Sequence, residues 1–460
     1  MQLISLPFLL FAAATLVVYY FLARKAQNAW LLAASYFFYV TLSWEYALAL
    51  LAVTLLNFYI GKKAGSRSWL ALGVGINLAS FASLKLISGP YGPRLLSAPP
   101  EALGLLLPIG FSFYILQAVS YLIDIHNRQA DAADDFVDFA LYLTFFPKLL
   151  SGPIERPARF LSQLRAARRV DASALARGVG LILVGLLRKI VIADRLTSFL
   201  PPTVFSDPAA FSSLEKIAWL LVFTFGLYND FAGYTSIARG LGALFGIELG
   251  PNFRQPFFSN SFSDFWTRWH ISLSFWLRDT VFFPARRWTM QKRWPQLLTV
   301  ILPPLVTMLA SGYWHGAHAA MIAWGGLHGL YLVGEQLLKA KTPRAPSRLR
   351  SASSVLFVFA LTSLAWIPFA ASSLRAAVDY FTGLFAFTAQ ITSAIPAPDL
   401  IAAAAFTFWL DWQETRHATD AFFMKWTPHA QAWGLVAALW LLVLFLGPQA
   451  NVVTFVYQGF

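Results

Sequence analysis

The sequence predicts an all-α polytopic membrane protein. Of its 460 residues 58% are hydrophobic and only 12% are charged, and the hydrophobic residues gather in runs long enough to cross a bilayer. The mean hydropathy of +0.58 is too high for a soluble globular chain. The 17 Trp and 16 Tyr residues suit aromatic belts at the two membrane interfaces.

Apolar runs follow one another along the whole chain. Some are shorter than the roughly 20 residues that a helix needs to cross a bilayer, so 29–44 and 231–246 are expected to be short, re-entrant or broken helices. We expect about 10–13 crossings. The first run is interpreted as a retained helix because further apolar segments follow it. The runs are 3–23, 29–44, 45–61, 68–88, 104–124, 136–154, 175–194, 214–228, 231–246, 297–311, 317–338, 353–371, 375–392, 397–411 and 431–447.

Lysine and arginine cluster in a few loops, which predicts the orientation of the chain. Loops rich in these residues stay on the cytoplasmic side, so the N-terminus is expected outside and the weakly charged loop 88–103 on the outer face. The net charge of +13 follows from these loops. Nucleic-acid binding is not favoured because no compact basic domain lies outside the membrane. The basic loops are Arg24-Lys25, Lys62-Lys63 with Arg67, 156–169, Arg286-Arg287 with Lys292-Arg293, and 339–350.

Four of the seven histidines, His270, His315, His318 and His328, lie in the stretch 262–335. The last three stand in a run with no charged residue, where an ionisable ring is costly to bury without a task or a partner. This cost is the main indication of function in the sequence. His328, thirteen residues after His315, is expected to point elsewhere.

His315 is the first candidate for catalysis. Gly312 and Gly316 allow close approach of a backbone or a substrate, and Trp314 can form a cavity wall. Burial disfavours the charged imidazole, so a buried ring can accept a proton from a hydroxyl as a general base. The alternative interpretation is an imidazole that hydrogen-bonds two helices together.

The spacing of His315 and His318 places both rings on one face of a single helix. The sequence HGAH also raises the possibility of a metal site. Zinc would need a third ligand, the nearest acid downstream is Glu335, and no HExxH motif is present, so no metal is expected. The absence of cysteine excludes disulfides, thiolate metal sites and cysteine nucleophiles.

His270 belongs to a segment whose aromatic residues follow helical spacing. The segment is expected to lie at the membrane interface or to re-enter the membrane, with Arg268, Arg278 and Asp279 at its polar edges and Trp269 beside the histidine. His270 could serve catalysis or could be an interfacial ring that touches lipid headgroups.

Asp230 and Arg239 are the other charged residues expected inside the membrane. A carboxylate at this depth is normally paired, and Asp230 and Tyr234 are spaced for contact across one helical turn. A structural role is favoured for this pair over a catalytic one. The region after the linker 342–353 has few chemically distinctive residues apart from the polar piece 411–420.

Eight short sequence motifs are spread along almost the whole chain. With them the sequence resembles the membrane-bound O-acyltransferase (MBOAT) superfamily, and within it the bacterial branch of the alginate O-acetylation membrane protein. His270 and His315 are 45 residues apart, similar to the spacing in that family. The motifs are LPIGFSFY (107–114), FFPKLLSGPIERP (145–157), LYNDFAGY (227–234), NFRQPF (252–257), SDFWTRWHISLSFWLRD (263–279), SGYWHGAH (311–318), WGGLHG (324–329) and FVYQGF (455–460).

The resemblance implies a fold and a set of site residues. The fold is one membrane domain, 1–460, in which a ring of tilted helices and half-helices surrounds a trans-bilayer tunnel, with the catalytic segment at about 252–338. His315 would be the catalytic residue at the narrow middle of the tunnel and His270 the second functional position. The tunnel or supporting residues would be Trp314, His318, Trp269, Asp230, Tyr234, Arg268, Arg278 and Asp279.

The resemblance also implies an activity. It is the transfer of an acyl group, expected to be acetyl, from a cytoplasmic thioester to a hydroxyl on the outer side of a bacterial cytoplasmic membrane. The donor would be acetyl-CoA or an acyl carrier thioester, with no permanently bound cofactor. The acceptor would be a polysaccharide or a partner acetyltransferase of the SGNH type. D-alanyl transfer to teichoic acid and peptidoglycan acylation keep the same fold, and a transporter is the alternative from another class, although no inverted repeat is visible.

The chain departs from the family pattern at three places. Relatives often carry a second Asp where this chain has 235–237, a tyrosine-containing, glycine-rich stretch where it has 280–288, and an arginine where it has Thr267. The second departure lies at the expected cytoplasmic mouth, so donor binding is the part of the family pattern that transfers least directly.

Overall fold

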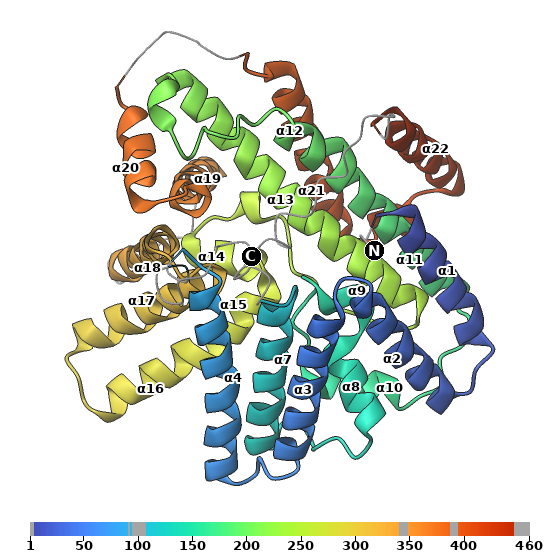
Figure 1. The fold of residues 1–460 in the computed structure, drawn as a ribbon. Helices are drawn as coiled ribbons and strands as arrows, with labels where there is room; N and C mark the ends of the chain where they lie inside the picture. Colours follow the sequence, from blue (N-terminus) through green and yellow to red (C-terminus); the bar gives the residue numbers. More distant parts are fainter. Residues whose placement is uncertain (1–3, 91–92, 94–106, 340–347, 387–393, 446–460) are drawn as a thin grey trace.

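The structure is a computed structural model that describes residues 4–90, 93, 107–339, 348–386 and 394–445. Every regular element in these ranges is a helix, which confirms the predicted all-α class (Figure 1). Most of loop 88–103, parts of the runs 104–124 and 375–392, the linker 342–347 and the ending FVYQGF lie outside the described residues.

In the N-terminal half, three helices lie side by side and two further ones lie next to them. Figure 1 shows α3, α4 and α7 side by side, with α8 and α10 next to them. Nearly every residue of α7 is buried, so this helix lies inside the bundle. The helices are α1 (Leu6–Tyr20), α2 (Arg24–Val40), α3 (Trp44–Gly61), α4 (Arg67–Ile87), α7 (Phe111–His126), α8 (Phe136–Thr144), α9 (Phe146–Leu149) and α10 (Pro157–Leu164).

The longest helix crosses the centre of Figure 1. It is α13 (Ser213–Leu244), 32 residues that begin at a capping box formed by Ser212 and Glu215. The prediction that 231–246 is a short, re-entrant or broken helix is therefore wrong. The polar residues around Asp230 interrupt the apolar pattern without ending the helix, because charged side chains of a neighbouring helix bond to them.

That neighbour is α11 (Ala172–Leu186), which continues into the π-helical segment η1 (Leu187–Asp194) and then α12 (Arg195–Thr197). Two pairs of glycines, Gly178 with Gly240 and Gly185 with Gly233, stand opposite each other on α11 and α13. A Cβ atom built on either member of a pair would lie within 3.0 Å of the other member's carbonyl oxygen. The absence of side chains at these positions lets the two backbones touch.

Replacing Gly185 with alanine is expected to lower the apparent melting temperature of the detergent-solubilised protein. The new Cβ would lie 2.6 Å from the carbonyl oxygen of Gly233, so the two helices would have to separate. Gly75→Ala is the matched control, because a Cβ there meets no atom within 4 Å and alanine favours a helix by about 1 kcal/mol. Equal melting temperatures for the two variants would contradict this account.

The segment that contains His270 forms two short helices, with a break at the histidine itself. His270 has φ 42° and ψ 54°, a left-handed conformation that ends α14 and starts α15. The helical spacing predicted across this segment is therefore interrupted. The elements are η3 (Pro256–Phe258), α14 (Phe262–Arg268), α15 (Ile271–Leu277), η4 (Arg278–Phe282) and α16 (Phe283–Gln291).

The two motifs around His315 and His328 lie on an antiparallel pair of helices, α17 (Gln296–His315) and α18 (Ala319–Lys339). Helix α17 ends at His315 because Gly316 is extended, with φ −166° and ψ 134°. The prediction that His318 shares a helical face with His315 is therefore wrong. Gly312 permits the predicted close approach, since a Cβ there would overlap with the carbonyl oxygen of Met321.

The C-terminal part adds helices to one side of the bundle. Figure 1 shows α19 beside α18, α21 beside α13, and α22 at the edge, where it packs against η1, the continuation of α11. The remaining elements are η2 (Pro208–Ala210), α19 (Arg348–Ala370), α20 (Leu374–Gly383), α21 (Ala397–His417), η5 (Phe422–Lys425) and α22 (Pro428–Phe445).

Five of the described helices are long and apolar enough to cross a membrane. They are Trp44–Gly61, Arg67–Ile87, Gln296–His315, Ser351–Ala370 and Pro428–Phe445, and α1 is a shorter apolar helix. The membrane class predicted from composition is confirmed by these helices. The total of about 10–13 crossings stays a prediction.

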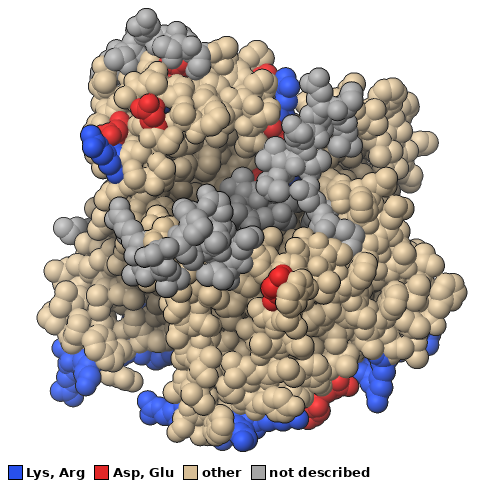
Figure 2. All heavy atoms as spheres, in the orientation of Figure 1, with Lys and Arg blue, Asp and Glu red and all other residues tan. Residues whose placement is uncertain are grey.

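Basic side chains gather along one edge of the molecule. Figure 2 shows Lys and Arg along the lower edge, where Figure 1 places the α3–α4 and α16–α17 turns. The basic residues of these two turns are exposed, namely Lys62, Lys63 and Arg67 in the first and Arg286, Arg287, Lys292 and Arg293 in the second. Two of the predicted cytoplasmic loops therefore lie on the same side, as the charge rule requires.

Candidate active site

Three buried imidazoles form a row through the centre of the bundle, and indole rings separate them. His270 contacts Trp314 at 5.8 Å between ring centroids, and Trp314 contacts His315 at 4.7 Å. His315 contacts Trp324 at 4.9 Å, and Trp324 contacts His328 at 5.0 Å. The row brings together residues from three separate motifs of the sequence.

His315 is enclosed by aromatic rings at the C-terminal end of α17. Its side chain is 2% exposed, and the rings of Trp314, Trp324 and Phe369 lie 4.7–5.3 Å from it. The end of the helix directs the ring toward α18 and α19 instead of toward a helical neighbour on α17. These apolar surroundings are those expected for a neutral base.

His270 is held by its backbone and by aromatic rings. Asn252 binds both residues that follow, since its carbonyl oxygen accepts from the Ile271 N–H at 2.8 Å and its Oδ1 accepts from the Ser272 hydroxyl at 2.6 Å. The imidazole is 1% exposed, stacks on Phe113 and meets the edge of Phe231 at 4.8 Å. The left-handed backbone at a non-glycine residue is strained and is kept by these contacts.

Trp314 connects the two predicted catalytic histidines. Its ring contacts both imidazoles, and its Nε1 donates to the carbonyl oxygen of Ser112 at 3.4 Å, which fixes the indole against α7. A group that reached Trp314 could contact a proton acceptor on one side and a hydrogen-bond donor on the other. The sequence identified these three residues, and the structure places them together.

His328 was expected to point elsewhere, and that expectation is wrong. It reaches the same row across Trp324, because α18 packs antiparallel to α17. The ring is fully buried, and among the described residues neither of its nitrogens has a hydrogen-bond partner. Trp266 Nε1, on a ring 5.0 Å from His328, also lacks a partner there. The motif WGGLHG, which contains both Trp324 and His328, was the sequence feature that could have indicated this position.

The other residues predicted beside His270 have different surroundings. Trp269 is buried and packs on Trp366 at 4.9 Å and on Phe253 at 5.1 Å. Arg268 is partly exposed and pairs with Asp264 at 2.8 Å on its own helix. Trp269 therefore packs the wall behind the site, and Arg268 marks a polar edge as predicted.

Arg278 and Asp279 lie at the second polar edge of this segment. Asp279 accepts from Arg278 Nε at 2.9 Å and from Arg156 Nη2 at 2.7 Å, and Arg156 also reaches Asp124 at 3.3 Å. These charges tie α15 and η4 to α7 and to the predicted basic loop 156–169. His318 is half-buried in the connection between α17 and α18.

Asp230 and Tyr234 are buried on α13 and bind other parts of the chain. Asp230 Oδ1 accepts from Lys189 Nζ at 2.7 Å, and the Tyr234 hydroxyl accepts from the Ser151 N–H at 3.0 Å. Lys189 also pairs with Asp194 at 2.8 Å. These contacts agree with the structural role that the sequence favoured for Asp230.

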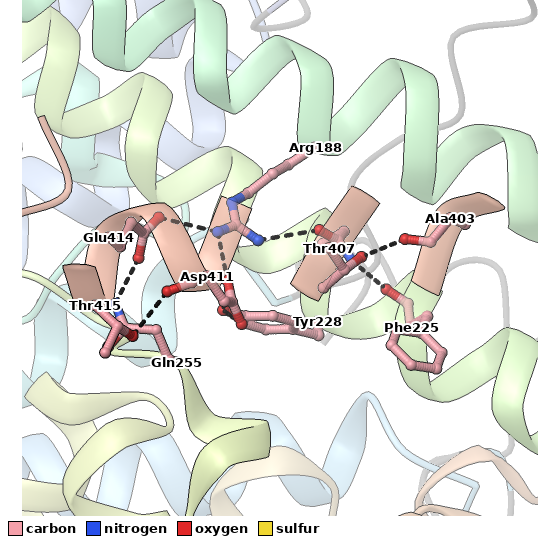
Figure 3. Close-up of polar contacts among 10 residues, drawn as sticks. Arg188, Phe225, Tyr228, Gln255, Ala403, Thr407, Asp411, Glu414 and Thr415 are labelled. Carbon is pink, nitrogen blue, oxygen red and sulfur yellow. Dashed lines mark hydrogen bonds and ion pairs between the residues drawn. The ribbon is translucent and has the colours of Figure 1, made fainter. Parts of the chain in front are cut away.

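A second buried cluster of charges surrounds Arg188 of η1 (Figure 3). Its guanidinium donates to Asp411 at 2.7 Å, to Glu414 at 2.9 Å and to Asn229 at 3.1 Å, and Tyr228 donates to Asp411 at 2.9 Å. Sequence reasoning missed this cluster. The polar piece 411–420 could have indicated this cluster, because a carboxylate in an apolar region needs a partner of opposite charge.

Two cavities lie elsewhere in the described structure. One of about 370 Å³ is lined by apolar residues of α11, α21, η5 and α22. The other, of about 20 Å³, lies beside Arg188 and Glu414 and has room for about one water molecule. Neither is lined by His270 or His315, so the trans-bilayer tunnel stays a prediction.

Comparison with known proteins places this arrangement in a family. A sequence model of the membrane-bound O-acyltransferase family matches residues 125–370, which include all three histidines of the row. A protein of Pseudomonas putida named "probable alginate O-acetylase" is 34% identical over 398 residues, 82% of this chain and 79% of the relative.

Two relatives with other names match less well. The peptidoglycan O-acetyltransferase of Helicobacter pylori is 28% identical over 80% of this chain and 76% of its own length. The teichoic acid D-alanyltransferase of Bacillus subtilis is 30% identical over 49% of this chain and 58% of its own length. The chain belongs to the membrane-bound O-acyltransferase family and is an O-acyltransferase.

Proposed function

We propose that this protein transfers an acetyl group from a cytoplasmic thioester, across the bacterial cytoplasmic membrane, to a hydroxyl on the outer side. The observation that carries the proposal is the meeting of His270 and His315 on Trp314 in the buried centre of the bundle. The names of the relatives that match most of the chain support an acetyl group over a D-alanyl group.

The two histidines would divide the chemistry between them. His315 accepts the proton of the acceptor hydroxyl while that oxygen attacks the thioester carbonyl carbon. His270 donates a hydrogen bond to the carbonyl oxygen, which carries negative charge in the tetrahedral intermediate. The C–S bond then breaks, the thiolate leaves and takes the proton from His315, and an oxygen ester and a free thiol remain.

The distribution of charge supports the direction of transfer. The exposed basic residues of the α3–α4 and α16–α17 turns suit the phosphates of acetyl-CoA or of an acyl carrier. Helix α17 begins just after the second turn, and its 20 residues rise about 30 Å to His315. The donor would enter from the basic edge, and its acyl group would extend into the bundle.

The acceptor would be a polysaccharide hydroxyl or a hydroxyl of a partner acetyltransferase of the SGNH type. Peptidoglycan is an alternative polymer, because a peptidoglycan O-acetyltransferase matches 80% of the chain. D-alanyl transfer is less well supported, because that relative matches 49% of the chain.

A sealed-vesicle assay tests the proposal. The purified protein is reconstituted with an alginate oligosaccharide trapped inside, and acetyl-CoA labelled in the acetyl group is added outside. The vesicle fraction with the basic loops outward, identified by protease access, is expected to form acetyl esters on the trapped oligosaccharide. Protein-free vesicles and detergent-opened vesicles are the controls. Movement of substrate into the vesicles without ester formation would contradict an acyltransferase and indicate a transporter.

A further inference from the structure

The buried cations of this protein have partners, with one exception. Six lysine and arginine side chains are buried in the described part of the chain. Five of them donate hydrogen bonds or form ion pairs: Lys148 to Gln117 and Tyr142, Arg168 to Tyr19 and Asn28, Arg188 to Asp411 and Glu414, Lys189 to Asp230 and Asp194, and Lys216 to Phe211. The sixth, Lys85, has neither a hydrogen bond nor an ion pair within the described ranges.

Lys85 lies on the inner face of α4. The buried residues of that helix are Gly73, Asn77, Phe81 and Lys85, at intervals of four, so they form one stripe. The end of the stripe meets α17, where the Tyr313 hydroxyl donates to the Ala82 carbonyl oxygen at 2.9 Å. Lys85 as a whole residue is 6% exposed, so most of its side chain packs against protein and not against lipid.

The same contacts bring Lys85 close to the candidate active site. Tyr313 immediately precedes Trp314 and His315 on α17. Gly89, just after the end of α4, lies against Ala317 in the connection that carries His318. The end of α4 that carries Lys85 therefore packs against the end of α17 that carries His315, on the side of the α17–α18 connection.

Its depth places Lys85 on the side opposite the basic edge. Arg67, at the start of α4, belongs to the exposed basic turn, and the 18 residues from there to Lys85 rise about 27 Å along the helix. The hydrocarbon core of a bilayer is about 30 Å thick. With the basic turns in the cytoplasm, Lys85 faces the compartment from which the acceptor of the proposed reaction comes.

An unpaired buried ammonium is costly, and this cost needs a physical reason. Charged residues inside membrane proteins almost always pair with one another or line the path of a substrate. Of the other five buried cations, Arg188 and Lys189 pair with carboxylates, and the remaining three donate to neutral oxygens. Within the described ranges Lys85 has no such partner, so we assign it to the second pattern.

We propose that Lys85 binds an anionic group of the acyl acceptor, a carboxylate or a phosphate, and thereby holds the neighbouring hydroxyl beside His315. This inference rests on the proposed function and adds the charge class of the acceptor. The inference also places the two substrates at opposite ends of the site, because the phosphates of the donor are expected at the basic edge.

The test compares Lys85→Gln and Lys85→Arg with the wild-type protein in detergent, with acetyl-CoA as donor. Three acceptors are used: a uronate oligosaccharide, the same oligosaccharide with its carboxylates reduced to alcohols, and a glycerol phosphate oligomer. We expect Lys85→Gln to raise the KM for the anionic acceptor about ten- to a hundredfold, the range of a charge-assisted hydrogen bond. The KM for acetyl-CoA and the rate with the neutral acceptor should change little, and Lys85→Arg should retain binding.

Arg195→Gln is the control, because it removes an exposed cation that pairs with Asp399. The acceptor whose KM responds to Lys85→Gln identifies the anion, carboxylate or phosphate. An equal loss of rate with neutral and anionic acceptors would show a structural role and overturn the inference, as would an unchanged KM for every acceptor. If the wild-type protein acetylates the neutral acceptor alone, the inference fails and the proposed function survives. If it acetylates none of them, nor a partner acetyltransferase of the SGNH type offered as acceptor, both fail.

Discussion

Replacing His315 with alanine is expected to slow acetyl transfer by about 10²–10⁴-fold, the contribution of a general base to such a reaction. The ring is buried among Trp314, Trp324 and Phe369, so no solvent base can take its place. The rate of ester formation on a hydroxyl acceptor, at saturating acetyl-CoA, measures the effect. Gel filtration in detergent confirms that the variant is folded.

His318→Ala is the matched control for this experiment. His318 is also a histidine, three residues away and half-buried in the connection between α17 and α18, and the proposed chemistry does not use it. Its rate should stay within a few-fold of the wild type. Full activity of the folded His315→Ala protein would rule out the proposed role of this ring.

Replacing Arg188 with leucine is expected to destabilise the protein by about 3–5 kcal/mol, the usual cost of breaking a buried ion pair. Asp411 is fully buried and Glu414 nearly so, and without the guanidinium two like charges would face each other. The variant should show a lower apparent melting temperature in detergent and a lower yield in membranes.

Two further variants show whether burial of the charge causes the loss. Arg195→Gln breaks an ion pair that is 46% and 29% exposed at its two members, and it should cost less than about 1 kcal/mol. Arg188→Leu combined with Asp411→Asn and Glu414→Gln removes the stranded charges and should recover part of the stability. An equal loss for Arg188→Leu and Arg195→Gln would contradict the account.

Much of the architecture could be predicted from the sequence, because a bilayer imposes simple rules. Apolar runs give the positions of most helices, and the basic turns next to Lys62 and Arg286 lie on one edge as the charge rule predicts. The cost of burying an ionisable ring identified His315, and the family resemblance added His270. The two lie on either side of Trp314.

The features that were missed depend on contacts between distant parts of the chain. Asp411 is 223 residues from Arg188, and no sequence feature next to either residue indicates that the two form an ion pair. The continuity of α13 through Asp230 depends on Lys189 in another helix. His318 left the helical face because Gly316 adopted an extended backbone, which glycine permits and does not require.

Four consecutive residues of α13 each contact a different part of the structure. Tyr228 bonds to Asp411, Asn229 to Arg188, Asp230 to Lys189, and Phe231 lies against the ring of His270. These four residues lie on one continuous helix, so the helix backbone holds their positions relative to one another. A shift of the charged cluster around Arg188 is therefore expected to displace Phe231 and, with it, one wall of the His270 pocket.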